Sequence, residues 1–161
     1  SALEAIGFEN GTTHAEVILN QSGPVIVEIA GRPGGGRIPT DLIPLAHGMD
    51  FMADSLRVSV GRPPVEKRTH ARGAALYWFP ALSGRINAIE GLYDARRMLG
   101  VVDLSISVQP GDVISPAVDC VTRDSVGYVL TDGATCSEAV AAAKRALAAC
   151  RIQTFPDLSS S

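Results

Sequence analysis

The chain has 161 residues, of which 46% are hydrophobic and 19% are charged, and its formal net charge at pH 7 is −3. This composition is typical of a soluble globular protein with room for one domain or two small ones. The acidic balance and scattered basic residues argue against a nucleic-acid partner, and no apolar run approaches the roughly 18 residues that a membrane span needs.

The first half of the chain predicts a β-hairpin followed by a loop and two helices. Two runs are rich in β-branched and apolar residues, and residues 20–24 (NQSGP) between them have the composition of a turn. We expect strands at 12–19 and 25–30, an irregular loop at 32–37, and helices at 40–47, with Thr40 as N-cap, and at 49–59. Residues 1–61 are then one unit, and the Pro-containing residues 62–70 are a linker.

The second half predicts a small mixed α/β subdomain over residues 71–156. The expected elements are strands at 72–79, 85–90 and 101–108, a helix at 91–98, a second hairpin formed by 117–122 and 126–131, and a final helix. That helix is the clearest element, because Thr135 and Glu138 have the spacing of a capping box and apolar residues recur after them at helical intervals. The Ser-rich residues 157–161 are expected to be a disordered tail.

The cysteines indicate a reducing compartment. Cys120, Cys136 and Cys150 are far apart, odd in number and form no CxxC pair. We expect all three to be small, reduced core residues. No basic segment precedes an apolar run at the N-terminus, so no signal peptide is expected, and we place the protein in the cytoplasm.

The first hairpin carries the residues of chemical interest. With a three-residue loop at 21–23, Asn20 faces Pro24 and Glu16 directly faces Glu28. Alternation then separates two faces of the hairpin. The expected core face contains Val17, Leu19, Val25, Val27 and Ile29, and the polar face contains His14, Glu16, Ile18, Ile26 and Glu28, with Arg32 in the same phase.

Two carboxylates opposite each other repel, and a divalent cation removes that repulsion. Magnesium prefers oxygen ligands and is often held by one or two carboxylates together with nucleotide phosphates. A nearby arginine such as Arg32 can stabilise negative charge on the same oxygens. The alternative is that Glu16 and Glu28 are ordinary solvent-facing residues of a half-exposed sheet, and the pattern alone leaves both interpretations open.

Other residues near the hairpin have two interpretations each. His14 could orient a carboxylate or contact a phosphate, or it could be a surface residue. The amides of Gly34, Gly35 and Gly36 could approach a phosphate or a substrate carboxylate, or these residues could be a flexible connection. Arg37 could bind a substrate carboxylate or face solvent. His47 and His70 have no partner in the sequence and are interpreted as structural or exposed.

Residues 14–36, HAEVILNQSGPVIVEIAGRPGGG, resemble the signature of the ATP-grasp superfamily. The resemblance implies that Glu16 and Glu28 bind magnesium, that Arg32 stabilises an acyl-phosphate intermediate, and that Ile18 contacts adenine. The family's asparagine between the second glutamate and the arginine is Ala30 here. The Arg-Pro-Gly-Gly form resembles the L-amino-acid ligases and dipeptide synthases more than the biotin carboxylases.

This resemblance implies an α+β fold: the C-terminal half of an ATP-grasp domain, followed by a small mixed α/β subdomain. The implied protein is an ATP-dependent carboxylate–amine ligase that uses Mg²⁺, or Mn²⁺, with small-molecule carboxylate and amine substrates. The lysine and the glycine-rich lid with which the family holds ATP are absent. We therefore expect the N-terminal part of the same enzyme as a partner and no activity from this chain alone. The resemblance also allows a homodimer. Two alternatives stay open: an ATP-grasp carboxylase or purine-pathway ligase, and a non-catalytic interaction domain with a vestigial metal site.

Overall fold

The computed structural model describes residues 2–65 and 67–156. The chain divides into two compact units, residues 1–71 and residues 72–161, which are described separately here. The tail predicted to be disordered at 157–161 lies outside the described residues. None of the helices in the described part of the chain has both the length and the apolar character that crossing a membrane requires.

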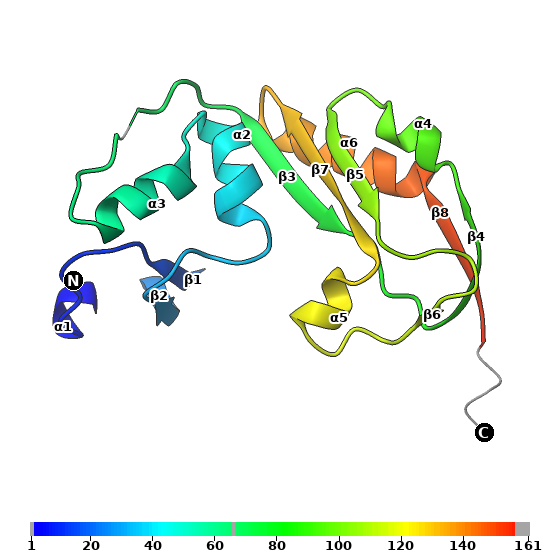
Figure 1. Ribbon diagram of the computed structural model, residues 1–161, viewed down its shortest axis with the longest axis horizontal. Coiled ribbons are helices and arrows are strands. Elements are labelled where there is room, and N and C mark those ends of the chain that lie inside the picture. Colours follow the sequence, from blue (N-terminus) through cyan, green and yellow to red (C-terminus); the bar gives the residue numbers. More distant parts are fainter. Residues whose placement is uncertain (1, 66, 157–161) are drawn as a thin grey trace. The chain divides into compact units, whose positions relative to one another are not determined.

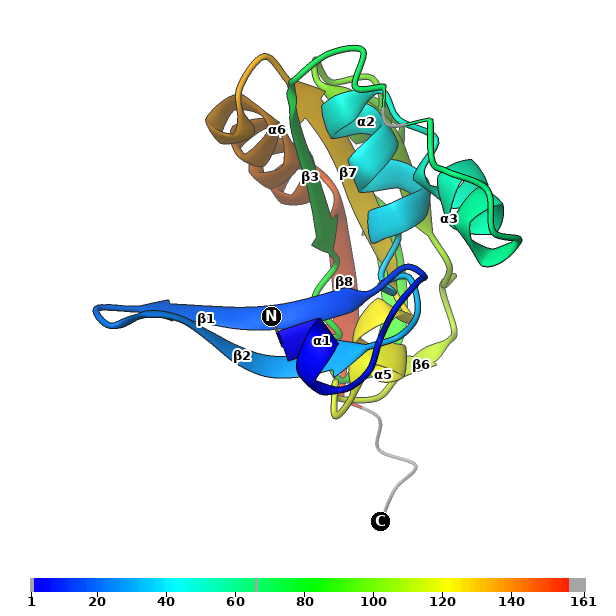
Figure 2. The ribbon, with the colours of Figure 1, turned by 90° about the vertical axis from the view of Figure 1, so that its left-hand side faces the viewer.

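The first unit consists of an antiparallel hairpin and several short helices. Its elements are α1 (Ala2–Ala5), β1 (His14–Asn20), β2 (Gly23–Ala30), the π-helical turn η1 (Ile38–Leu42), α2 (Ile43–His47) and α3 (Phe51–Ser59). Figure 2 shows β1 and β2 as a long two-stranded ribbon whose turn lies far from the helices of the unit. The predicted order of hairpin, loop and helices is therefore confirmed.

The first helical segment begins earlier than predicted. Arg37 precedes it in the left-handed conformation (φ 62°). Pro39 lies in its first turn, where the backbone N–H has no partner within the helix, so proline is tolerated there. Thr40 lies inside η1 and donates its hydroxyl to the Asp41 carboxylate. The prediction of Thr40 as N-cap is therefore wrong.

The segment that follows α3 is hydrogen-bonded to its own unit. Thr69 N donates to His47 O (3.1 Å), and His70 Nε2 lies 2.9 Å from Leu45 O. His70 is thus a structural residue, which is one of the two interpretations that the sequence allowed.

The second unit contains two three-stranded antiparallel sheets and a long helix (Figure 1). Its elements are β3 (Gly73–Trp78), β4 (Gly84–Glu90), α4 (Leu92–Arg96), β5 (Val101–Ile106), β6 (Val113–Ile114), α5 (Cys120–Asp124), β7 (Gly127–Gly133), α6 (Cys136–Ala149) and β8 (Arg151–Phe155). The strands follow the order β3-β7-β5 in one sheet and β6-β4-β8 in the other. α6 packs on β3 and β7, and so covers one face of the first sheet.

The hairpin predicted from 117–122 and 126–131 is wrong in its first half. Residues Cys120–Asp124 form the helix α5, because Asp119 caps it: Thr122 N donates to Asp119 Oδ1 at 2.8 Å, and the Thr122 side chain completes a capping box. The second predicted strand is β7, but its partners are the distant strands β3 and β5. The short strands β6 and β8 were not predicted.

The final helix agrees with its prediction. Thr135 Oγ1 accepts a hydrogen bond from Glu138 N (3.2 Å), and Glu138 Oε2 accepts one from Ala134 N (2.8 Å). The helix buries small side chains against the sheet, namely Ala139, Ala142, Ala143 and Ala146. Small residues let the helix lie close to the strands, where dense packing is most favourable.

The core of the second unit joins both sheets and α6. Its larger buried side chains are Phe79, Ile86, Leu104, Ile114, Val126 and Val129. Cys150 belongs to this core, as predicted, but Cys120 and Cys136 are exposed, so the prediction is wrong for these two. Each is the first residue of a helix, α5 or α6, and neither points its side chain into the core.

Candidate functional site

β1 and β2 are joined by a tight turn of two residues, Gln21 and Ser22. Asn20 pairs with Gly23, whose φ of 109° favours glycine, and Asn20 Oδ1 accepts a hydrogen bond from Ser22 N (2.8 Å). The three-residue loop predicted at 21–23 is therefore wrong, and pairing next to the turn is one residue out of the predicted register.

A β-bulge farther along the hairpin restores the predicted pairing where it matters. Val17 pairs with Ile26 but Glu16 pairs with Glu28, so Val27 is an extra residue on β2. The shorter turn shifts the strand register by one residue, and the bulge shifts it back by one residue. Glu16 directly faces Glu28, as predicted.

The bulge moves two residues between the faces. Cross-strand partners share a face, so Val25 lies with Ile18 on the carboxylate face and Ile26 lies with Val17 on the other. The predicted faces of Val25 and Ile26 are therefore wrong. The face predicted to be core is exposed, with Leu19 81% accessible, because the described residues place no layer over it.

The two glutamates present their carboxylates to solvent. The Glu16 side chain is 58% exposed and Glu28 is also exposed. Like charges directly opposite on neighbouring strands destabilise a hairpin, so this pair contributes nothing to folding by itself. Ile18 follows on the same face and is exposed too, which leaves an apolar surface beside the carboxylates.

His14 lies at the open end of the same face, opposite Ala30. Its Nε2 is 3.7 Å from Glu16 Oε1, and its side chain is 25% exposed. The imidazole also covers Gly34: a Cβ placed on that glycine would lie 2.7 Å from Nδ1. The structure therefore brings together His14, Glu16, Glu28 and Gly34.

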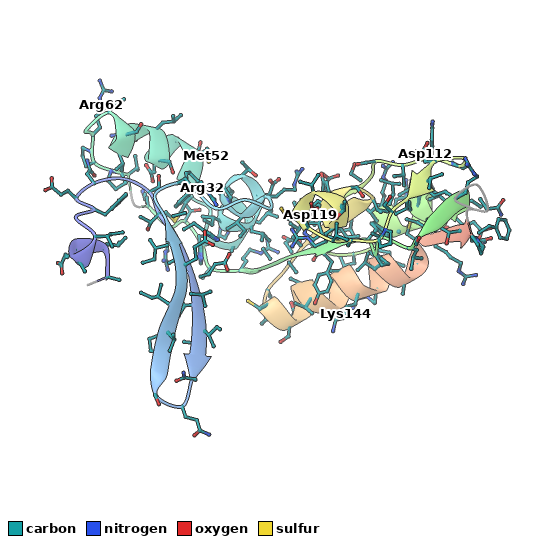
Figure 3. The ribbon with its side chains drawn as sticks, turned by 90° about the horizontal axis from the view of Figure 1, so that it is seen from below. Arg32, Met52, Arg62, Asp112, Asp119 and Lys144 are labelled. Atoms are coloured by element: carbon teal, nitrogen blue, oxygen red, sulfur yellow. The ribbon has the colours of Figure 1, made fainter. Side chains whose placement is uncertain are left out.

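Arg32 begins the loop that leaves β2. Figure 3 shows it at the open end of the hairpin, away from the β1–β2 turn. Its Nη1 donates to Pro33 O at 3.2 Å, and its side chain is exposed. The guanidinium thus folds back on its own loop, at the same end of the hairpin as His14.

Arg37 ends the loop and is held by an ion pair. It is the one non-glycine residue with positive φ in the described part of the chain, and Gly36 before it has φ 61°. Its Nη2 lies 2.9 Å from Asp41 Oδ1. This ion pair was not predicted, although the i,i+4 spacing of arginine and aspartate on a helical segment is the signal for it.

The donor set of the hairpin fits magnesium completed by phosphate oxygens. Glu16 and Glu28 offer hard oxygen ligands, and magnesium typically takes one or two protein carboxylates. Among the described residues, no group of three or more His, Cys, Asp or Glu side chains could hold a metal alone. An all-protein cage, as used for structural zinc, is therefore not formed by the part of the chain that the structure describes.

Comparisons with known sequences find one family and two curated proteins similar to this chain. Residues 77–154 match the family L-amino acid ligase C-terminal domain 2. Dapdiamide A synthase of Enterobacter agglomerans is 25% identical over 138 residues, which cover 80% of this chain and 32% of the synthase. An uncharacterised protein of Sinorhizobium fredii is 28% identical over 159 residues, 97% of this chain and 33% of that protein. The chain spans about a third of the length of these curated relatives.

Solved structures show the same fold. The L-amino acid ligase from Bacillus licheniformis superposes with a TM-score of 0.74 at 23% identity, covering 96% of this chain and 38% of the ligase. Phosphoribosylglycinamide synthetase from Anaerococcus prevotii superposes with a TM-score of 0.76 at 16% identity, covering 96% and 39%. The biotin carboxylase subunit of pyruvate carboxylase gives 0.61 at 19% identity, covering 96% and 34%.

The chain therefore has the α+β fold of the C-terminal region of an ATP-grasp ligase, as residues 14–36 predicted. Within that fold, residues 77–154 resemble the L-amino acid ligase C-terminal domain 2.

Proposed function

We propose that this chain forms the metal-binding side of the ATP site in a ligase that joins the carboxylate of an amino acid to an amine. The observation that carries the proposal is the direct pairing of Glu16 and Glu28, which a bulge in β2 sets up. Bulges near active sites often re-aim side chains. A hairpin without a ligand would gain stability by separating these charges, so their pairing supports a cation between them.

The proposed reaction has two steps. An oxygen of the substrate carboxylate attacks the γ-phosphorus of ATP, ADP leaves, and an acyl phosphate forms. The amine nitrogen then attacks the acyl carbon, phosphate leaves, and the nitrogen loses a proton as the amide forms. Magnesium, when bound, neutralises charge on the phosphates and orients the transferred group. Glu16 and Glu28 hold it there, and Arg32 donates hydrogen bonds to the oxygens on which negative charge develops.

The remaining candidate residues have supporting roles in this proposal. Ile18 contacts the adenine base from the carboxylate face, and His14 acts beside the phosphates. The amides of Gly34, Gly35 and Gly36 approach a phosphate or the substrate carboxylate. Arg37 binds the carboxylate of the amino-acid substrate, and its ion pair with Asp41 fixes the direction of its guanidinium.

The proposal requires more polypeptide than the 161 residues of this chain. The chain corresponds to 38% of the Bacillus licheniformis ligase, and the remaining part of the site would come from an N-terminal portion of the same enzyme. This chain alone is then inactive. The three free cysteines agree with a cytoplasmic enzyme, and the proposal allows a homodimer.

Two observations favour an amino-acid ligase over the ATP-grasp carboxylases and purine-pathway ligases of the same fold. Residues 77–154 match an L-amino acid ligase domain, and the similarity to Dapdiamide A synthase extends over 80% of the chain. The non-catalytic alternative has one observation in its favour. Ala30 lies on the carboxylate face opposite His14, where its methyl group offers no ligand.

The proposal is tested by magnesium-dependent binding of a non-hydrolysable ATP analogue to the full-length protein. Wild type is compared with Glu28→Gln and Arg32→Ala by calorimetry and by an assay of ATP-dependent ligation. We expect Glu28→Gln to abolish the magnesium dependence of binding. We expect Arg32→Ala to lose turnover by roughly 10²–10³-fold, because it removes a donor to the developing charge, while analogue binding largely remains.

Matched controls remove similar side chains elsewhere. Glu90→Gln removes an exposed carboxylate at the end of β4, and Arg62→Ala removes an exposed guanidinium in the segment after α3. Both should leave binding and ligation unchanged. Absence of binding in wild type, or equal magnesium-dependent binding by Glu28→Gln, would favour the alternative of a non-catalytic interaction domain.

A further inference from the structure

One imidazole contacts both the hairpin and the glycine-rich loop. On one side, His14 Nε2 lies 3.7 Å from Glu16 Oε1. On the other side, a Cβ built on Gly34 would lie 2.7 Å from Nδ1, 3.1 Å from Cε1 and 3.4 Å from Cγ. The ring therefore lies beside Gly34 with its Nδ1 corner closest, between the first glutamate and the loop that begins at Arg32.

The ring explains why position 34 is glycine. Neither Gly34 nor Gly35 has a positive φ, so the backbone conformation permits an alanine at both positions. A Cβ on Gly35 would meet nothing within 4 Å, whereas a Cβ on Gly34 would enter the imidazole. A side chain is therefore excluded at position 34 by the imidazole of His14, and not by the backbone conformation of a turn.

The geometry argues against His14 as a third metal ligand. Magnesium prefers oxygen ligands, and no group of three His, Cys, Asp or Glu side chains that could hold a metal exists among the described residues. Nε2 also makes no hydrogen bond to the Glu16 carboxylate, because their separation of 3.7 Å exceeds the usual 2.7–3.2 Å, so the ring acts by its bulk. The ring is placed to hold other groups in position.

The strand pairing leaves space for this arrangement. His14 pairs with Ala30 across the hairpin, and the small alanine side chain leaves room beside the imidazole. The ring is only 25% exposed there. A surface histidine with no role would keep more of its freedom in solvent, because ordering a side chain costs conformational entropy.

We propose that His14 is a positioning residue that holds the loop of residues 32–36 against β1. The ring lies against the backbone two residues after Arg32 on one side and near the Glu16 carboxylate on the other, and so restricts both the loop and the first proposed metal ligand. This inference rests on the proposed function, and it assigns His14 a mechanical role in place of direct contact with a phosphate. Partners that orient metal ligands typically contribute roughly 10–100-fold to metal affinity, which sets the size of the expected effect.

The test measures Mn²⁺ binding by electron paramagnetic resonance, in the full-length protein with a non-hydrolysable ATP analogue present. We expect His14→Ala to weaken Mn²⁺ binding by roughly 10-fold or more with little change in melting temperature. Gly34→Ala should have a similar effect, because its methyl group displaces the ring. The double variant should be no worse than either single one, since removing the ring removes the clash.

Gly35→Ala is the matched control for this cycle. Its methyl group enters open space, so its effect should add to that of His14→Ala without interaction between the two. If His14→Ala does not fold, His14→Gln keeps a side chain of similar reach and replaces it in the cycle. We expect the effects of substitutions at positions 14 and 34 on Mn²⁺ affinity to be non-additive, and those at positions 14 and 35 to be additive.

The outcomes separate this inference from the proposed function. If wild type binds Mn²⁺ and Glu28→Gln does not, while His14→Ala binds as wild type does, only the role of His14 is overturned. The same holds if His14→Ala lowers the melting temperature but leaves the affinity unchanged, or if the effects at positions 14 and 34 are additive. A wild type that binds no Mn²⁺–nucleotide overturns the proposed function and the role of His14 together.

Discussion

The two units differ in how much apolar surface each of them buries. The second unit has a continuous core that includes Phe79, Leu104 and Val129, all nearly inaccessible. In the described part of the first unit, the only residues classed as buried are Pro39 and Ser55. The first unit holds every predicted site residue and the second holds none. The difference indicates that the second unit is stable by its own packing, while the first exposes apolar surface that its described residues do not cover.

The largest effect is expected when the two units are expressed separately. We expect residues 72–161, expressed alone, to melt in one cooperative transition, because their core closes within the unit. Residues 1–71 alone should show no cooperative transition, since so little apolar area is buried to offset the entropy of ordering the chain. Circular dichroism with temperature measures both. A cooperative transition for residues 1–71 would contradict the difference drawn between the units.

Substitution of one leucine in each unit sharpens the comparison. Leu104 is 2% exposed and Leu19 is 81% exposed. Leu104→Ala should lower the free energy of unfolding by about 3 kcal/mol, because it leaves a cavity in the core. Leu19→Ala should change it by less than about 0.5 kcal/mol. Urea denaturation of the 161-residue chain measures both, and equal effects would show that the hairpin face is covered in solution.

The sequence predicted the elements that depend on local signals. The capping residues Thr135 and Glu138 marked the start of α6 correctly, and turn residues at 20–24 marked the hairpin. The failures came where two local signals compete. At residues 117–122 the apolar character suggested a strand, but the cap formed by Asp119 and Thr122 produced a helix.

The candidate site was predicted in part and for a reason that was itself partly wrong. The pairing of Glu16 with Glu28 was expected from a three-residue loop, and it arises from a two-residue turn together with a bulge at Val27. A bulge has no strong local signal in the sequence, so its position could not be predicted. The contact between His14 and Gly34 could not be predicted either, because it joins a strand to a loop that follows the partner strand.

The N-caps of the long helices give a smaller test of the independence of the units. Asp50 Oδ1 accepts a hydrogen bond from Ala53 N (2.9 Å) at the start of α3, and Thr135 caps α6 in the second unit. Replacing either cap with alanine removes about 1 kcal/mol of helix stability. We expect Thr135→Ala to lower the melting temperature of the cooperative transition, and Asp50→Ala to leave that transition in place. A shift of the main transition by Asp50→Ala would mean that both units unfold together.

The smallest expected effect is a pH dependence confined to the second unit. Burial raises the pKa of the Cys150 thiol above its ordinary value of 9.0, and the nearby Arg96 only partly opposes this. The folded thiol therefore stays protonated at a pH where the unfolded thiol ionises. Because the folded pKa is the higher one, this contribution to stability is complete below pH 9 and is lost as the pH rises through the folded pKa.

Urea denaturation of residues 72–161 between pH 8 and pH 11 measures this loss. Cys150→Ala should remove part of the decline in stability with pH, although it also costs packing at every pH. Cys136→Ala, at an exposed cysteine, should leave the decline unchanged. Identical slopes for Cys150→Ala and wild type would show that the thiol is solvated in the folded state. The core of the second unit would then be open at the end of α6, and the contrast with the first unit would be smaller than the packing indicates.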